Sequence, residues 1–138
     1  MRNFLIVLAI AALSLTSCGR KEPPQPVVSD SPPQITEIKH SVSGNSLRID
    51  LKLAGGSYGI GFQVDRAEID PHCDCPSFWR RYTEAAPKAK NYELPGLSKL
   101  INLRGGDMEY AFRVRAIDAL GRFSEWSKTI RARSQLEY

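Results

Sequence analysis

The residues with the clearest capacity for chemistry lie in one short stretch, His72-Cys73-Asp74-Cys75. Thiolates, imidazoles and carboxylates bind metal ions, and two neighbouring thiols can form a disulfide. Structural zinc sites usually draw four ligands from two separated pairs such as C-x-x-C. This stretch has a C-x-C spacing and no second pair. We therefore predict neither a metal site nor a cofactor.

Cys73 and Cys75 are instead predicted to form a local disulfide. Cys18, the third cysteine, belongs to a separate motif near the N-terminus, so these two thiols are left to pair with each other. A ring closed across one residue is small, and strained, exposed disulfides are reduced more easily than relaxed ones. We favour a structural bridge. The alternatives are a metal site, a redox-catalytic pair, and thiols that are free or paired with another molecule.

A second group combines guanidinium groups with an indole ring. Arg113 and Arg115 share the outward face of a predicted strand, and Trp126 lies on the segment that follows it. A guanidinium stacked on an aromatic ring contributes about 0.5–1 kcal/mol at an exposed site. These residues could form a structural ladder, which we favour, or a patch that binds a ligand.

A third group lies between Phe78 and Tyr82, and its candidate surface residues are Phe78, Trp79 and Arg81. Aromatic residues and arginine are enriched among the residues that dominate binding interfaces. They are also ordinary strand residues, and one of these aromatic rings must face the core. Packing within the domain and contact with a partner are therefore both interpretations of this stretch.

No pattern typical of an enzyme accompanies these groups. The chain has no nucleophile elbow and no glycine-rich phosphate loop, and its two histidines, His40 and His72, stand in unrelated contexts. The net charge of +4 is mildly basic, but no clustered reading motif for nucleic acid is present. We predict a non-catalytic protein that does not bind nucleic acid.

The elements that position these residues are predicted to be strands. Between Tyr110 and Ile117 apolar and polar residues alternate, Gly121 supplies a turn, and 123–130 is predicted to be the returning strand. Further strands are predicted upstream at 34–42, as an edge strand, and at 47–53, 60–69 and around 92–94. A polar connector is expected at 85–90.

The stretch from Tyr110 to Ser127, YAFRVRAIDALGRFSEWS, resembles the last two strands of a fibronectin type III domain. The resemblance extends over roughly 32–133, with 91–97 similar to the fifth strand of that family. It implies an immunoglobulin-like, seven-stranded all-β sandwich of two antiparallel sheets, used as a binding or spacing module. It also makes Tyr110 the candidate tyrosine corner, and suggests that Phe62, Val64 and Ala67 face the core.

The segment from Phe123 to Ser127 resembles the Trp-Ser-x-Trp-Ser box of cytokine-receptor fibronectin domains, with Phe123 in place of the first tryptophan. In those domains the tryptophans stack between arginines. The resemblance therefore implies that Trp126 stacks against Arg113 and Arg115.

The first seventeen residues are predicted to be a signal peptide. Arg2 is followed by an apolar run of about ten residues, which is the length of a signal core and short for a membrane span. Leu15-Thr16-Ser17-Cys18 then resembles the bacterial lipobox, in which the cysteine is acylated and becomes the new N-terminus. Cys18 is thus the expected lipidation site, and acyl chains there would anchor the protein to a membrane.

The rest of the chain divides into three parts. Residues 18–33 contain five prolines and are predicted to be a disordered tether, 34–133 form the sandwich, and 134–138 are a tail. Gly19 after the cysteine implies outer-membrane sorting. We expect an envelope lipoprotein that presents the domain to a protein or glycan, or a structural spacer within an outer-membrane assembly.

Overall fold

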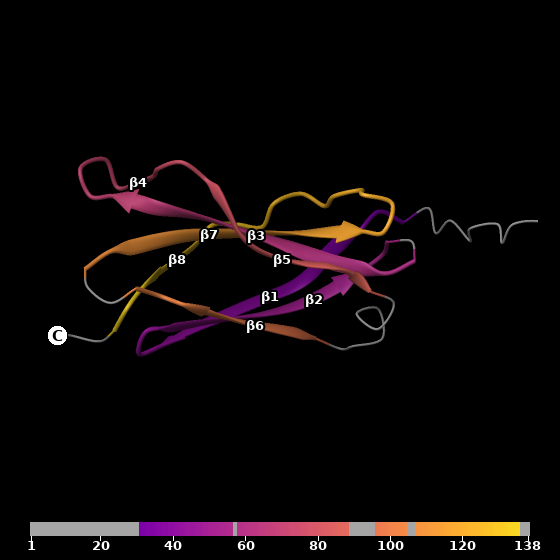
Figure 1. Cartoon of the computed structure of the whole chain (residues 1–138), viewed down its shortest axis with the longest axis horizontal. Helices are drawn as coiled ribbons and strands as arrows, with labels where there is room; N and C mark the ends of the chain where they lie inside the picture. Colours follow the sequence, from indigo (N-terminus) through magenta and orange to yellow (C-terminus); the bar gives the residue numbers. More distant parts are fainter. Residues whose placement is uncertain (1–30, 57, 89–95, 105–106, 136–138) are drawn as a thin grey trace, which may run out of the picture.

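The computed structural model describes residues 31–56, 58–88, 96–104 and 107–135, and these form two antiparallel sheets packed face to face (Figure 1). The described residues contain no helix, and therefore none that could cross a membrane. The predicted signal peptide, Cys18 and the expected strand around 92–94 lie outside the described residues. The all-β sandwich predicted from the sequence is confirmed.

The first sheet has three strands in the order β1-β2-β6. They are β1 (Gln34–Ser43), β2 (Ser46–Ala54) and β6 (Leu97–Asn102). The predicted strands at 34–42 and 47–53 are confirmed, and β1 lies at the edge of the sheet as expected. The strand that pairs with the other edge of β2 begins at Leu97, in a stretch that the sequence pattern did not mark as a strand.

The second sheet contains β3 (Ile60–Asp70), β4 (Cys75–Pro76), β5 (Arg80–Lys88), β7 (Glu109–Asp118) and β8 (Ile130–Arg133). Its order is β4-β3-β7-β8, and β5 pairs with β3. With the first sheet this gives seven strands of a sandwich, and β4 adds a two-residue strand at one end. The expected connector at 85–90 was wrong for 85–88, because these residues continue β5.

The core lies between the sheets and is built from alternate residues of β2, β3 and β7. Its largest fully buried side chains include Tyr110, Phe112, Leu47 and Ile49. The expectation that Ala67 faces this core was wrong. Ala67 lies with Ile69 and Ala111 in a small separate cluster covered by Trp79, because its position has the opposite parity to Val64.

The returning strand is shorter than expected. Only Ile130–Arg133 pairs with β7 as a regular strand, opposite 109–112, while a single isolated bridge joins Ile117 to Phe123. The prediction of a strand over 123–130 was therefore wrong for 123–129. These residues are held to β7 by a mixture of backbone and serine side-chain hydrogen bonds, as described below.

Both ends of the predicted domain reach slightly further than expected. Ser31 accepts hydrogen bonds from the Gly56 amide at 2.9 Å and from Arg122 at 3.4 Å, and Pro33 is buried. At the other end the Gln135 amide donates to the Gly44 carbonyl at 2.9 Å. Contacts with the sandwich therefore include Ser31 and Pro33 of the segment assigned to the tether, and Ser134 and Gln135 of the segment assigned to the tail.

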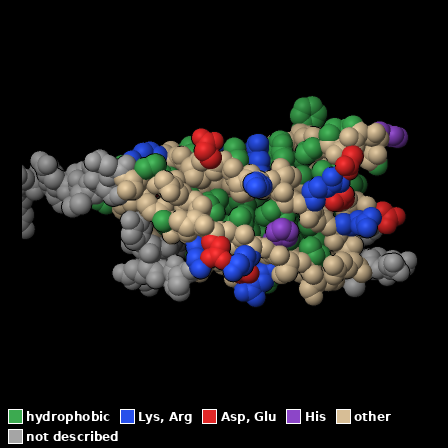
Figure 2. Space-filling view, turned by 180° about the vertical axis from the view of Figure 1, so that it is seen from behind, with side chains coloured by type: hydrophobic (Ala, Val, Ile, Leu, Met, Phe, Trp, Pro, Cys, Tyr) green, Lys and Arg blue, Asp and Glu red, His purple; other side chains and the backbone are tan. Residues whose placement is uncertain are grey.

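A groove of about 640 Å³ lies between β1 and the irregular segment 123–128. Ile35 and Ile38 line one wall, and Phe123 and Trp126 contribute to the other. Figure 2 shows this side of the molecule, where hydrophobic side chains are visible along the seam between the two sheets. The groove forms where the chain beside β7 is not a regular strand.

Tyr110 occupies the position expected of a tyrosine corner. Its side chain is almost completely buried, at 2% exposure, and Arg66 stacks on its ring with 4.9 Å between the guanidinium carbon and the ring centroid. The predicted hydrogen bond runs to the preceding loop, of which residues 105–106 lie outside the described residues. The corner itself stays a prediction.

Gly61 allows the backbones of β3 and β5 to approach closely. A Cβ at this position would overlap the carbonyl oxygen of Ala85 and lie 2.8 Å from the nitrogen of Pro87. We expect Gly61→Ala to lower the free energy of unfolding by about 1–3 kcal/mol through overpacking. Urea denaturation would measure the change. Gly96→Ala is the control, because its Cβ would meet only the Leu51 carbonyl at 3.7 Å; equal losses would contradict the explanation.

Candidate functional site

The outer face of the five-stranded sheet carries a ladder of alternating guanidinium groups and aromatic rings. Arg113 lies between Trp79 and Trp126, with its guanidinium carbon 4.5 and 4.2 Å from the two ring centroids. Arg115 lies between Trp126 and Phe123, at 4.4 and 3.8 Å. The five side chains therefore form one continuous stack, in the order Trp79, Arg113, Trp126, Arg115 and Phe123.

Cross-strand register places polar partners beneath the two arginines. Asp65 of β3 pairs with Arg113 of β7 and with Arg81 of β5, and it accepts hydrogen bonds from them at 3.1 and 2.7 Å. Asp65 is only 6% exposed, so this buried carboxylate has a guanidinium on each side. A buried charge is tolerated when it is paired in this way.

Gln63, two residues before Asp65 on β3, binds Arg115 in a similar way through its side-chain amide. Gln63 accepts a hydrogen bond from Arg115 at 2.9 Å and donates one to Glu84 at 3.2 Å. Glu84 also accepts from Arg81 at 3.1 Å, which links the two rows. Burial is the main cause that lowers the pKa of Arg115, and the nearby charge of Arg81 adds to the effect.

Two serines fix the segment that carries the rings of Phe123 and Trp126. Ser124 and Ser127 each form two hydrogen bonds with one residue of β7: the backbone amide donates to a carbonyl, and the hydroxyl accepts from an amide. The bonds to Ala116 measure 3.0 and 2.8 Å, and those to Val114 measure 2.8 and 3.0 Å. The serines recur every three residues, as Phe123 and Trp126 do, so serines and rings point in different directions.

The structure brings together residues that the sequence placed in separate groups. Trp79 joins Arg113, Arg115 and Trp126 in the ladder, and the two arginines also bind the polar row beneath them. Tyr82 faces the core, where its ring meets Phe112 edge-on at 6.3 Å between centroids. One aromatic ring of the stretch from Phe78 to Tyr82 therefore faces the core, as the sequence required.

Two further residues of the predicted surface remain open to solvent. Phe78 is 86% exposed, and the Arg81 side chain is 37% exposed although its guanidinium is bound to Asp65. Sequence reasoning missed Asp65 and Gln63. The signal that could have found them is the alternation of β3, which puts both residues on the other face of the strand from Phe62 and Val64.

The second chemical cluster lies at the turn between β3 and β4. Cys73 and Cys75 are joined by a disulfide with a Cα–Cα distance of 5.2 Å. Asp74 between them has a positive φ of 53°, a conformation that aspartate tolerates better than most residues. Among the described residues, no group of three or more His, Cys, Asp or Glu could hold a metal ion.

This turn is fastened without the disulfide. The Asp74 amide donates to the Asp70 carbonyl and the Ser77 amide donates to the Glu68 carbonyl, both at 2.8 Å. For so short a loop, the loop-closure model gives the disulfide only roughly 1.5 kcal/mol of stabilisation, before any strain is subtracted. The bridge therefore adds little to a turn that is already closed.

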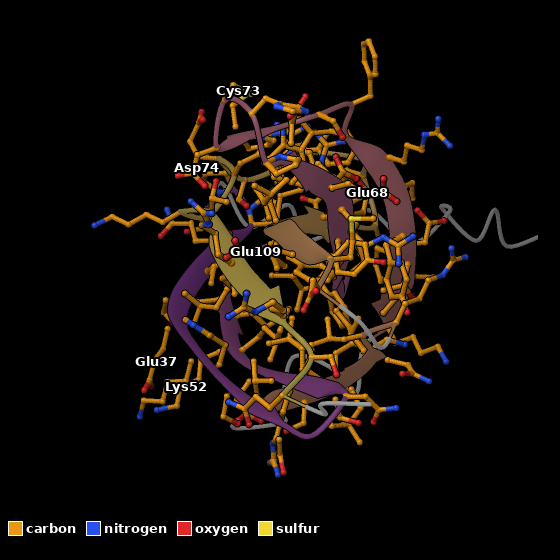
Figure 3. All side chains as sticks on the ribbon, turned by 90° about the vertical axis from the view of Figure 1, so that its left-hand side faces the viewer. Glu37, Lys52, Glu68, Cys73, Asp74 and Glu109 are labelled. Carbon is orange, nitrogen blue, oxygen red and sulfur yellow. A yellow bond between two sulfur atoms is a disulfide. The ribbon has the colours of Figure 1, made fainter. Side chains whose placement is uncertain are left out.

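Arg131 connects the turn to the opposite edge of the sheet. Its guanidinium binds both carboxylate oxygens of Asp74, at 2.5 and 3.0 Å, and both of Glu109, at 2.7 and 3.0 Å. Figure 3 shows Asp74 and Glu109 on the same side of the molecule, next to Cys73 at the tip. Hydrogen bonds to Arg131 are the main cause that lowers the pKa of both carboxyl groups.

Comparisons with known proteins support the fold. No family model matches the chain, and no curated protein does. A solved structure described as a myokine structure is similar, with a TM-score of 0.51 and 19% identity over 75% of this chain and 98% of that one. The fold is a fibronectin type III-like sandwich. In this fold three strands, in the order β1-β2-β6, face the sheet that contains β3, β5, β7 and β8.

Trp126 lies between the two arginines of the ladder, so removing its ring breaks two guanidinium contacts. We expect Trp126→Ala to lower the free energy of unfolding by about 1–2 kcal/mol through its two guanidinium contacts alone. Chemical denaturation followed by circular dichroism would measure this. The matched control is Phe78→Ala, which we expect to change stability by less than about 0.5 kcal/mol because the ring is exposed. Similar losses in both variants would argue against the ladder.

The Arg131 cluster predicts a dependence of stability on pH. Because the pKa values of Asp74 and Glu109 are lowered in the fold, their contribution is present above the ordinary carboxyl range of about 4. It disappears as the pH falls through the lowered values. We expect the melting temperature of the wild type to fall more steeply below about pH 4 than that of Arg131→Gln.

The control for this experiment is Arg133→Gln, which removes the same charge from the same strand; in the described part of the chain no contact joins Arg133 to Asp74, and its charge is the smallest of the causes that shift the pKa of Glu109. It should retain the acid-dependent loss of the wild type. If Arg131→Gln and the wild type give parallel curves of melting temperature against pH, the cluster does not contribute to acid sensitivity.

Proposed function

We propose that this chain is a bacterial envelope lipoprotein, anchored through Cys18, that holds its fibronectin type III-like module for contact with a protein or a glycan. The observation that carries the proposal is the motif Leu15-Thr16-Ser17-Cys18 directly after an apolar run. Acyl chains gain about 0.8 kcal/mol for each buried methylene, so more than one chain makes a stable anchor. Gly19 supports sorting to the outer membrane.

The arrangement of the domain suits display. The described chain begins at Ser31 at one end of the sandwich, and the β3–β4 turn with Cys73 lies at the opposite end (Figure 1). A tether anchored at Cys18 would thus leave the β3–β4 end pointing away from the membrane. The most exposed aromatic ring, Phe78, follows this turn closely in sequence and has the character of an interface anchor.

The ladder acts as support for such a surface. Its arginines are held by rings on both sides and by Asp65 and Gln63 beneath, so the face is rigid before any partner binds. A preorganised surface loses less conformational entropy on binding. The partly exposed Trp79 and Phe123 at the two ends of the stack are the ladder residues best placed for contact.

The second candidate is a structural spacer in an outer-membrane assembly. The observation that favours it is the self-sufficiency of the same ladder, in which Arg113 and Arg115 already stack and hydrogen-bond within the domain. Groups that are satisfied internally have less to offer a ligand. In a spacer the ladder would serve stiffness alone.

Replacing the anchor residue tests the proposal. We expect Cys18→Ser to move the protein from the membrane fraction to the soluble fraction of the envelope, and mass spectrometry to find acyl groups on Cys18 only in the wild type. Ser17→Ala is the control, because small residues are tolerated before the modified cysteine. An unacylated wild-type protein, or membrane association that survives Cys18→Ser, would contradict the anchor.

A further variant separates display from spacing. If the module binds a partner through its distal end, Phe78→Ala should reduce chemical cross-linking to that partner in intact cells. Stability should stay within about 0.5 kcal/mol of the wild type. If cross-linking is unchanged in Phe78→Ala but lost when the tether is shortened, the spacer interpretation is the better one.

A further inference from the structure

We propose that the Cys73–Cys75 disulfide is a thiol–disulfide exchange site that takes a pair of thiols on a protein as its substrate. This goes beyond the proposed display function. It depends neither on acylation of Cys18 nor on the ladder, so each idea can fail without the other.

The first argument is that the fold does not need the bond. The turn is closed by backbone hydrogen bonds from Asp74 to Asp70 and from Ser77 to Glu68. The His72 amide also donates to the Asp70 carboxylate at 2.8 Å. Linking residues two apart removes little freedom from an unfolded chain. A disulfide that is dispensable for folding is free to serve another purpose.

The second argument is access. Both cysteines belong to the exposed residues of the described chain, and so do their neighbours at the turn. Exposed disulfides in small rings are the ones that behave as labile, regulatory or catalytic bonds. The negative charge of Asp74 would repel an incoming thiolate, and Arg131, which Asp74 shares with Glu109, offsets part of this repulsion through two hydrogen bonds. A thiolate can therefore approach the bond.

The exchange is balanced in atoms and electrons. A substrate thiolate attacks one sulfur, the bond between Cys73 and Cys75 breaks, and its electron pair leaves on the other cysteine as a thiolate. The second substrate thiol, as its thiolate, then attacks the mixed disulfide. The substrate ends as a disulfide, and Cys73 and Cys75 end as thiols after taking up the two protons that the substrate thiols released. Two electrons pass from the substrate to the chain.

The site has a docking feature suited to a protein. Phe78 lies three residues beyond Cys75 and exposes 86% of its surface, which is an unusual state for a large apolar side chain. A cavity of about 170 Å³ beside it is lined by Arg66, Glu68 and Ser77 among others. A polypeptide could use the ring as an apolar anchor while its thiols reach the turn. A free small thiol would gain nothing from it.

Exchange at this site is coupled to the Arg131 cluster. Asp74 lies between the two cysteines, so the ring constrains the residue whose carboxylate binds Arg131 of β8, which also binds Glu109 of β7. Reduction removes the ring and relaxes this constraint. Linkage makes this coupling reciprocal. The factor by which reduction weakens the contact between Asp74 and Arg131 is also the factor by which loss of that contact shifts the equilibrium toward the reduced form.

The test uses the chain with Cys18→Ser, in which Cys73 and Cys75 are the two remaining cysteines, equilibrated with reduced and oxidised glutathione. Trapping the thiols with an alkylating reagent and weighing the products gives the reduced fraction, and circular dichroism reports whether the fold persists. We expect reversible reduction of the folded protein, at a rate within about tenfold of that for the same chain unfolded in urea. A folded protein that stays oxidised while the unfolded chain is reduced would overturn the proposal.

Matched variants test the coupling to Arg131 and the alternative that the disulfide is only structural. Arg131→Gln should shift the glutathione equilibrium at least about threefold toward the thiols, while Arg133→Gln should leave it unchanged. The double variant Cys73→Ser, Cys75→Ser should melt no more than about 6–12 °C below the wild type, which is the shift that the loop-closure term of roughly 1.5 kcal/mol produces in a domain of this size. A much larger loss would make the bridge a structural element and refute the exchange role.

A protein probe tests the substrate class. With reduced, unfolded ribonuclease A as the dithiol, Phe78→Ala should exchange several-fold more slowly than the wild type, and with glutathione the two should be equal. Equal rates with ribonuclease would overturn the assignment of protein thiols as substrate. A variant that slows with both probes would show that Phe78 affects the turn itself and would equally refute the docking role.

Discussion

The pairing of β3 with β7 is the constraint on which the rest of the structure depends. These two long strands lie side by side in the centre of their sheet, and each sends alternate residues to opposite faces. One face supplies Phe62, Val64 and Phe112 to the core. The other aligns Asp65 with Arg113, so that a single register sets both the hydrophobic packing and the charged rows. A slip of one residue would exchange the two faces and bury the arginines.

That register also explains how a domain of this size tolerates several charged groups close to its interior. Asp65 is almost completely buried, yet arginines from the strands on either side neutralise it. The guanidinium groups are in turn covered by aromatic rings, which shield them from water and leave the Nε of Arg113 buried without a hydrogen-bond partner. Each contact is modest, but the groups share partners, so the entropy lost in fixing one side chain serves several interactions.

The two ends of the sandwich have different characters. At one end, the Gly56 amide donates to the Ser31 carbonyl, and Pro33 is buried. At the other, the disulfide turn and Phe78 lie in solvent and connect to the sheet through Arg131. If Cys18 anchors the chain as proposed, the disulfide turn and Phe78 lie at the end suited to contacts far from the membrane.

Local patterns were sufficient to predict most strands, because burial between two sheets imposes a period of two that β2, β3 and β7 display. They failed at 123–129, where the spacing of Ser124 and Ser127 follows a period of three and the serine hydroxyls, in place of backbone carbonyls, accept the hydrogen bonds from the amides of β7. They also failed at Ala67, because the pattern alone could not say that the outer face has its own apolar cluster under Trp79.

The sequence by itself determined the sandwich, the identity of the two stacking arginines, and the motif around Cys18. Each of these depends on residues that are close in the chain or follow a simple repeat. Only the tertiary structure decided that Trp79 caps the ladder, that Asp65 lies beneath it, and that Arg131 holds Asp74. These contacts join residues on different strands, and strand order and register, which no local pattern encodes, decide which side chains meet.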